Sequence, residues 1–312
     1  MIISASRRTD IPAFFSDWLI NRLKAGFVLI QNPRNPKRIA NVALDPSVVD
    51  CIVFWTKNPQ PMLNKLKVID DLGYQYYFQF TITPYDQQVE KNLPAKREIL
   101  ETFKKLSHKI GKHRIIWRYD PVFINKQFPL EYHLDAFGRL CASLADYTNT
   151  CIFSFIDMYA RVRINAKAII ATEVSEADKK RIAQSFSAIA GHHNLRLMTC
   201  SETLDFTSYG IARAACIDPS LLANMLGASV QSKKDPNQRP ACKCIESIDL
   251  GAYDCCRHGC VYCYATTSEK TVSRNSPRHD PCSPLLIGHP QGDETITVRE
   301  VRSLIDRQSA LF

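Results

Sequence analysis

The stretch CIVFWTKNP, residues 51–59, decides the fold class, because a short run of β-branched and aromatic residues ends abruptly in polar residues and a proline. A helical pattern follows at 60–72, and the same alternation recurs over the first two hundred residues, as is typical of βαβ units and a parallel sheet. The predicted strands are 2–5, 51–55, 76–83, 114–118, 151–156 and 195–199, with 28–31 as a further candidate. The predicted helices are 12–25, 60–72, 95–110, 130–146 and 175–190.

Six such units favour an α/β fold built as a partial TIM-like (β/α) barrel. A doubly wound sheet is less favoured, because no GxGxxG turn follows any predicted strand. We expect the barrel to span residues 1–230 and a C-terminal cysteine-rich segment, 231–312, to fold over its mouth. Within that segment a helix is expected at 298–304.

Composition and charge narrow the class of protein. With 312 residues, 45% of them hydrophobic, the chain can bury a core. It contains neither an apolar run long enough for a membrane helix nor a secretory signal, so we expect a soluble, cytoplasmic protein with reduced thiols and no membrane partner. The net charge of +9 is compatible with a nucleic acid or another anionic ligand, although much of it belongs to the solvated face of a helix at 96–112.

Polar side chains gather where the predicted strands end, which is where barrel enzymes place their working residues. The candidate ligand-binding residues at these ends are Arg7, Lys57, Thr81, Arg118, Asp120 and Asp157. Lys57 and Arg7 could each pair with a carboxylate or a phosphate. Asp10 could equally be a helix cap.

Nine of the twelve cysteines lie at or beyond residue 200, and the densest group is CRHGCVYC, residues 256–263. Three thiolates with this CxxxCxxC spacing can bind three irons of a [4Fe-4S] cube and leave the fourth iron open. The early Cys51, Cys141 and Cys151 lie in or beside apolar runs and are expected to pack as small hydrophobic residues.

The CxxxCxxC motif, with Tyr262 before its last cysteine, resembles the signature of the radical S-adenosylmethionine superfamily. The run HGCVYCYA is similar to the cluster loop of the spore photoproduct lyase branch, and residues 56–58 and 118–121 are weakly similar to two other segments of that branch. In the superfamily this loop follows the first barrel strand, whereas here it follows all of the predicted ones. From SASRRTDIP to YDCCRHGCVYCYA the chain also resembles an uncharacterised family, a domain of unknown function whose C-terminal cysteines are similar to the cluster motif.

The resemblance implies a [4Fe-4S] cluster on Cys256, Cys260 and Cys263, with S-adenosylmethionine (SAM) bound at the open iron. It also implies reductive cleavage of SAM to a 5′-deoxyadenosyl radical, an electron donor such as flavodoxin or ferredoxin, and an unknown substrate, which the basic strand ends predict to be anionic. The superfamily's GGE and GxIxGxxE motifs are absent, so candidate SAM contacts follow from position alone. They are Tyr262, Lys57, Thr81, Arg118, Asp120, Asp157 and Arg7. No residue is assigned as catalytic.

Four further cysteines could hold a second, auxiliary [4Fe-4S] cluster if they converge at the barrel rim: Cys200, Cys216, Cys242 and Cys244. Zinc is the alternative, because Cys242 and Cys244 with Cys260 and Cys263 have roughly zinc-ribbon spacing.

Two other functions stay open. One is a metal-dependent barrel hydrolase or nuclease with a structural zinc tail. Its candidate ligands are Asp10, Asp120, Asp157 and Glu202. The other is a non-catalytic nucleic-acid-binding protein.

Overall fold

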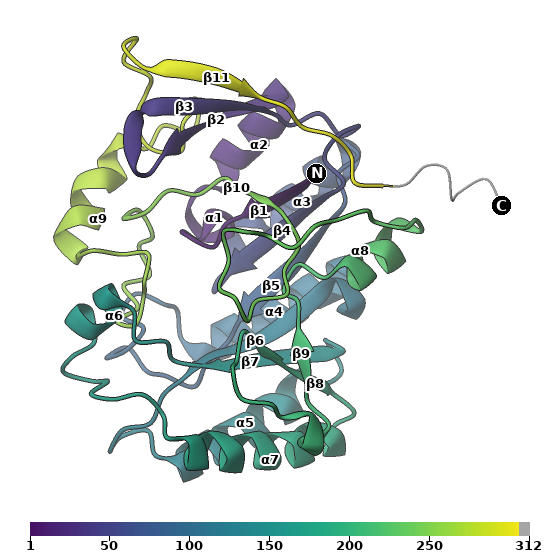
Figure 1. The fold of residues 1–312 in the computed structure, drawn as a ribbon, viewed down its shortest axis with the longest axis vertical. Helices are drawn as coiled ribbons and strands as arrows, with labels where there is room; N and C mark the ends of the chain where they lie inside the picture. The colour runs from purple at the N-terminus through teal and green to yellow at the C-terminus, as the bar shows by residue number, and fades with distance from the viewer. Residues whose placement is uncertain (306–312) are drawn as a thin grey trace.

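The computed structural model describes residues 1–305, and an eight-stranded parallel sheet forms its centre (Figure 1). The strand order is β10-β1-β4-β5-β6-β7-β8-β9. These strands are β10 (Ile248–Asp249), β1 (Ile2–Ala5), β4 (Cys51–Thr56), β5 (Tyr76–Thr81), β6 (Ile115–Val122), β7 (Thr150–Phe155), β8 (Arg196–Cys200) and β9 (Ala212–Ala214). The α/β fold class expected from the sequence is confirmed. In residues 1–305 the sheet stays open between its edge strands β9 and β10, so a closed barrel is not formed.

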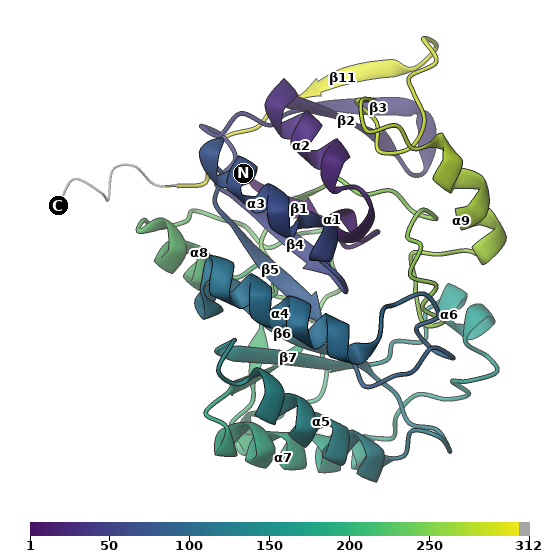
Figure 2. The same ribbon diagram turned by 180° about the vertical axis from the view of Figure 1, so that it is seen from behind.

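Helices cover one face of this sheet, and Figure 2 shows α3 and α4 in front of the strands, with α5 below β7. The helices are α1 (Ile11–Phe14), α2 (Ser16–Ala25), α3 (Leu66–Asp71), α4 (Lys96–Ile110), α5 (Leu130–Leu144), α6 (Ala160–Asn165), α7 (Glu176–His192), α8 (Pro219–Leu226) and α9 (Glu269–Asn275). Four short 3₁₀ helices join them in the described residues: η1 (Gln60–Lys65), η2 (Lys112–Arg114), η3 (Thr207–Tyr209) and η4 (Ser276–Arg278). The helical spacing predicted at 96–110 is confirmed, since Ile99, Phe103 and Leu106 are buried along one side of α4.

The opposite face of the sheet is buried as well. In β4, Ile52 and Phe54 join the core beneath the helices, while Cys51 and Val53 point into a second core. That second core includes Leu222 of α8 and the cysteines that precede β10. Burial on both faces explains why the strands appear in the sequence as unbroken apolar runs.

A second, three-stranded sheet corrects two expectations. It contains β2 (Phe27–Asn32), β3 (Asn35–Ala43) and β11 (Thr295–Arg299), so the candidate strand at 28–31 forms but lies outside the parallel sheet. The helix expected at 298–304 is wrong, because 295–299 pair as a strand with β3. Four of its five residues, TITV, are consecutive β-branched residues that favour a strand, and β3 pairs with them along one edge.

The C-terminal segment contributes β10 to the parallel sheet. The predicted division at residue 230 stays a prediction, and residues 306–312 of that segment lie outside the described part of the chain. Within residues 1–305 no helix has the length and apolar character needed to cross a membrane.

Candidate functional site

The cysteine loop, which carries Cys256, Cys260 and Cys263, starts at the carboxyl end of β10. This strand runs parallel to β1, with Ile248 opposite Ile3. The carboxylate of Asp249 accepts hydrogen bonds from the hydroxyls of Ser4 (3.0 Å) and Ser6 (2.6 Å), which fastens the end of β10 to the end of β1. A Cβ at Gly251 would lie 1.9 Å from Ser6 Oγ, so only glycine allows this close approach.

The loop then packs along residues 89–92, in the connection between β5 and α4. The Val261 N–H donates to the Val89 carbonyl (3.0 Å), and the Asn92 N–H donates to the His258 carbonyl (3.0 Å). An isolated antiparallel bridge pairs Glu90 with Cys260. The connection after β5 therefore holds the backbone on both sides of the middle cysteine.

The three loop cysteines are partly exposed, and the Cys263 N–H donates to the Cys260 carbonyl (3.1 Å). Burial of its sulfur raises the pKa of the Cys260 thiol to about 12, although the ammonium group of Lys57 opposes the shift. Burial also raises the pKa of the Cys256 thiol, and the neighbouring Cys263 adds to the effect. Such thiols lose their protons when a bound cation supplies positive charge.

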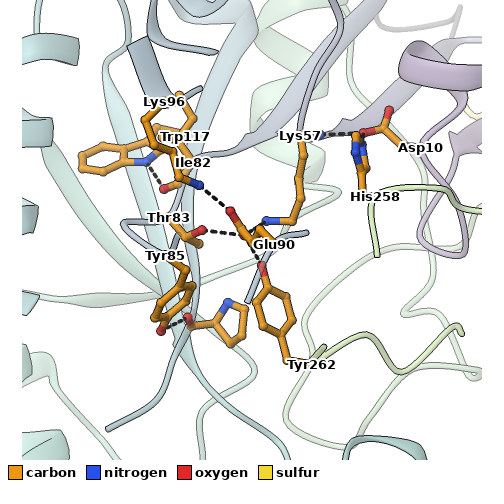
Figure 3. Close-up of polar contacts among 11 residues, drawn as sticks. Asp10, Lys57, Ile82, Thr83, Tyr85, Glu90, Lys96, Trp117, His258 and Tyr262 are labelled. Atoms are coloured by element: carbon orange, nitrogen blue, oxygen red, sulfur yellow. Dashed lines mark hydrogen bonds and ion pairs between the residues drawn. The ribbon is translucent and has the colours of Figure 1, made fainter. Parts of the chain in front are cut away.

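Glu90 is the centre of the polar network beside this loop (Figure 3). Its buried carboxylate accepts hydrogen bonds from Lys57 Nζ (2.8 Å), Thr83 Oγ1 (2.6 Å), Lys96 Nζ and the Tyr262 hydroxyl. Burial alone would raise the pKa of Glu90, but the ammonium groups of Lys57 and Lys96 outweigh it and lower the pKa to about 2. The carboxylate is thus charged and joins β4, α4 and the cysteine loop.

Asp10 forms a second link to the loop. Its Oδ1 caps α1 by accepting from the Ala13 N–H (2.9 Å), which agrees with the helix cap considered from the sequence. Its Oδ2 accepts from the Lys57 N–H (2.7 Å). The same Oδ2 lies 2.8 Å from Nε2 of His258, which is buried inside the cysteine motif (Figure 3). In the described residues the Nδ1 of His258 is buried without a hydrogen-bond partner.

The guanidinium groups of Arg7 and Arg118 flank the Trp55 ring, at 5.0 and 5.4 Å from its centroid. Arg118 is buried and paired with Asp120 (2.5 Å), and its positive charge helps to lower the pKa of that carboxyl against the effect of burial. Arg7 donates to the Ser247 hydroxyl (3.3 Å), and its Nη2 has no partner in residues 1–305.

The other predicted strand-end residues lie apart from the loop network. Thr81 ends β5 opposite Arg118 in the sheet register. Asp157, after β7, forms an ion pair with Arg239 on the surface.

The remaining cysteines of the predicted site form a buried thiol group. Cys200 ends β8, Cys216 follows β9, and Cys242 and Cys244 precede β10. The sulfur atoms of Cys200 and Cys216 are 3.1 Å apart, the N–H of Ile217 donates to Cys244 Sγ (3.4 Å), and the Cys244 N–H donates to Cys242 Sγ (3.5 Å). The neighbouring thiols of Cys216 and Cys242 lower the pKa of the Cys244 thiol.

The structure thus gathers Lys57 and Tyr262 beside the loop cysteines, and Arg118 beside the buried thiol group, where its Nη1 lies 2.9 Å from Cys216 Sγ. Sequence reasoning missed Glu90 and Lys96. Glu90 lies in segment 84–95, which has neither strand nor helix periodicity, and only its position just after a strand end could have drawn attention to it. Lys96 begins the predicted helix at 95–110, and the sequence assigned its charge to the solvated face, whereas it pairs with the buried Glu90.

Across residues 1–305, no three His, Cys, Asp or Glu side chains stand in the arrangement of a formed metal site. The carboxylates considered for a hydrolase are each engaged elsewhere: Asp10 with His258, Asp120 with Arg118, Asp157 with Arg239, and Glu202 with the Phe155 N–H (2.8 Å). A cavity of about 300 Å³ near the amino-terminal ends of β6–β8 is lined by none of the predicted site residues.

The chain is thus an α/β protein with a parallel sheet and two groups of cysteines near the ends of its strands. A family described as a domain of unknown function, DUF1848, matches residues 2–265, and the chain belongs to that family. No curated protein matches the chain. Among solved structures, a protein of Bacteroides thetaiotaomicron provisionally assigned as an alpha-L-fucosidase is 11% identical, with a TM-score of 0.23. That match covers 51% of this chain and 66% of the other.

Proposed function

We propose that this protein is a radical SAM-type enzyme, in which Cys256, Cys260 and Cys263 hold a [4Fe-4S] cluster. The open sheet would then be a partial TIM-like barrel, with the cysteine loop over its mouth. A cluster bound there supplies an open iron for SAM and the electron that cleaves it to a 5′-deoxyadenosyl radical.

The position of β10 carries this proposal. The chain's late cysteine loop conflicts with the superfamily order, in which the loop follows the first barrel strand. In space, however, β10 stands at the sheet edge before β1 and runs parallel to it, and the loop leaves its carboxyl end. In the spatial order of the sheet β10 is the first strand, and the loop follows it.

The thiols themselves fit such a group. Of the twelve cysteines, eight are buried and Cys282 is exposed, whereas Cys256, Cys260 and Cys263 are the three of intermediate exposure. Intermediate exposure suits soft ligands that must receive an inorganic cluster and leave one metal position open. The partnerless Nδ1 of the buried His258 is a polar atom inside the same loop that an added group could satisfy.

The surrounding residues of this chain would orient and shield that group. Glu90 fixes the backbone of Cys260 through the bridge and fixes Tyr262 through its hydroxyl. Lys57 stands over the Tyr262 ring, 5.4 Å from its centroid, and its positive charge faces the Cys260 sulfur. Arg7, whose Nη1 lies 3.8 Å from Asp235 and whose Nη2 has no partner in the described part of the chain, would bind the carboxylate of SAM or an anionic substrate.

The test is anaerobic purification with iron and sulfide analysis, followed by reduction with dithionite or flavodoxin in the presence of SAM. We expect a brown protein with about four irons on the loop cysteines and release of 5′-deoxyadenosine. Protein that contains zinc and no iron, without ever meeting air, would overturn the proposal and return the metal-dependent hydrolase and nucleic-acid-binding hypotheses.

A further inference from the structure

The buried thiol group, Cys200, Cys216, Cys242 and Cys244, takes no part in the proposed reaction. We propose that these four side chains bind one soft divalent metal ion, Zn²⁺ or Fe²⁺, as a closed four-thiolate site. The inference stands on these residues alone and does not require the loop cysteines to hold a cluster.

The donor set is the first argument. Three separate segments bring four free thiols to one place on the face of the sheet opposite the helices, and each residue is at most 9% exposed. The sulfurs of Cys200 and Cys216 are in contact, and the backbone N–H groups of Ile217 and Cys244 donate to the sulfurs of Cys244 and Cys242. Four cysteines are the full ligand set of a structural tetrahedral site.

The spacing is the second argument. A tetrahedral ion with metal–sulfur bonds of about 2.3 Å holds its sulfurs about 3.8 Å apart. The Cys200 and Cys216 sulfurs are 3.1 Å apart, so these two side chains need only separate slightly to bind one ion. A [4Fe-4S] cube, with sulfides between its irons, needs far wider separation of its thiolates. The close packing therefore favours a single ion over the auxiliary cluster expected from the sequence.

The polar surroundings suit thiolates. Arg118 donates from Nη1 to Cys216 Sγ (2.9 Å), and the N–H of Ile217 donates to Cys244 Sγ (3.4 Å). The Cys244 N–H points at Cys242 Sγ (3.5 Å). The guanidinium of Arg7 interacts electrostatically with Cys244 and Cys216. Four thiolates around a divalent ion carry two net negative charges, and the guanidinium groups of Arg118, which is paired with Asp120, and of Arg7, which lies 3.8 Å from Asp235, offset part of them.

The ion would act as a cross-link. It would join the end of β8, the residues after β9 and the segment that leads into β10, all of which are short or edge elements. A closed site of this kind contributes folding free energy and leaves no position for substrate.

The experiment uses the full-length chain with the three loop cysteines replaced, C256A/C260A/C263A, so that only this group can hold a thiolate-bound ion. Anaerobic titration of the metal-free protein with Co²⁺ is expected to give one equivalent with the visible absorption of tetrahedral cobalt thiolate, displaced by Zn²⁺. Adding the substitutions Cys216→Ser and Cys244→Ser to this protein should abolish the visible absorption of the bound cobalt. Cys51→Ser is the matched control, because Cys51 is a buried thiol on the same face of the sheet.

X-ray absorption of the wild-type protein as purified identifies the ligands of the metal and does not depend on whether the cysteine variants fold. Measured at the zinc edge, to which the proposed iron-sulfur cluster does not contribute, it should show zinc with four sulfur neighbours at about 2.3 Å. The proposal is overturned by no tetrahedral cobalt signal, by a signal that survives the double serine variant, or by iron with sulfide bound at these thiols. Because neither readout uses SAM, failure to cleave SAM would count against the proposed function only.

Discussion

The loop cysteines and the buried thiol group are built in opposite ways. Cys256, Cys260 and Cys263 come from one stretch of eight residues and stay partly open to the surface. The buried thiol group is collected from separate segments, and the sulfurs of Cys200 and Cys216 contact each other. The loop cysteines are therefore close together because of their spacing in the sequence, whereas the buried thiols are close together because of tertiary folding. Under the two proposals above, the loop cysteines would receive a reactive ligand and the buried group would be closed.

The largest effect is expected when a loop cysteine is removed. Cys260→Ala deletes one of three ligands of the proposed cluster, so formation of 5′-deoxyadenosine should fall to background and the iron content should drop. Cys282→Ala, which removes an exposed thiol, is the control and should keep both. The measurement is product by chromatography against iron per chain. Undiminished product from Cys260→Ala would contradict the division between the two groups.

Glu90→Gln should produce the largest loss of stability. It leaves two lysines beside a buried neutral amide, and breaking a buried ion pair in this way costs about 3 kcal/mol. Glu131→Gln is the matched control, because its contact with Arg181 is exposed and 3.9 Å long, and it should change stability by less than about 0.5 kcal/mol. Urea unfolding at pH 7 measures both free energies.

The effect of Glu90→Gln should also depend on pH. The pKa of Glu90 is lowered from 4.5 to about 2 in the folded state, so its charged form stabilises the protein above pH 4.5. That stabilisation disappears as the pH falls through about 2, because the unfolded chain takes up the proton first. The difference in unfolding free energy between wild type and variant should therefore shrink between pH 5 and pH 3. A constant difference would show that Glu90 acts by shape alone.

Gly251→Ala should loosen the start of the cysteine loop. The added Cβ would lie 1.9 Å from Ser6 Oγ and 2.6 Å from Ser6 Cβ, so β1 and β10 must separate, at a cost of about 2 kcal/mol. Gly138→Ala is the control of opposite sign. It lies within α5, where nothing stands within 4 Å of the new Cβ, and alanine should stabilise that helix by about 0.5 kcal/mol. Thermal unfolding of both variants checks the order.

The smallest perturbation is chemical labelling. In native, metal-free protein a thiol reagent should modify Cys282 first, then the loop cysteines, and the buried thiol group only after unfolding, because reaction needs access to the sulfur. Mass spectrometry of the labelled peptides gives the order. Early labelling of Cys216 or Cys244 would mean that the buried group is not sealed.

Local pattern predicted most of the fold. The strands near 2–5, 51–56 and 76–81 were predictable because apolar runs alternate with helical spacing, and α4 was predictable from its amphipathic face. The pattern failed for β10, because two residues are too short to carry a period. It also failed for β11, where pairing with β3 overrode the expected helix.

The site was predictable only where its residues are close in the sequence. The CxxxCxxC spacing stands in one stretch, but Glu90 meets Lys57 from 33 residues away and Tyr262 from 172 residues away. Such contacts form because the folded sheet brings strand ends together, and they cannot be predicted from composition or periodicity. The convergence of the four buried thiols was anticipated, whereas their close packing required coordinates.

The place of β10 also fixes an order of events during synthesis. A ribosome makes roughly 5–20 residues per second, so β1, Asp10 and Lys57 are synthesised well before residue 248. The sheet cannot gain its edge strand β10 until the last quarter of the chain has been made. The loop cysteines follow β10 in the chain, so any metallocluster would be inserted only at the end of synthesis.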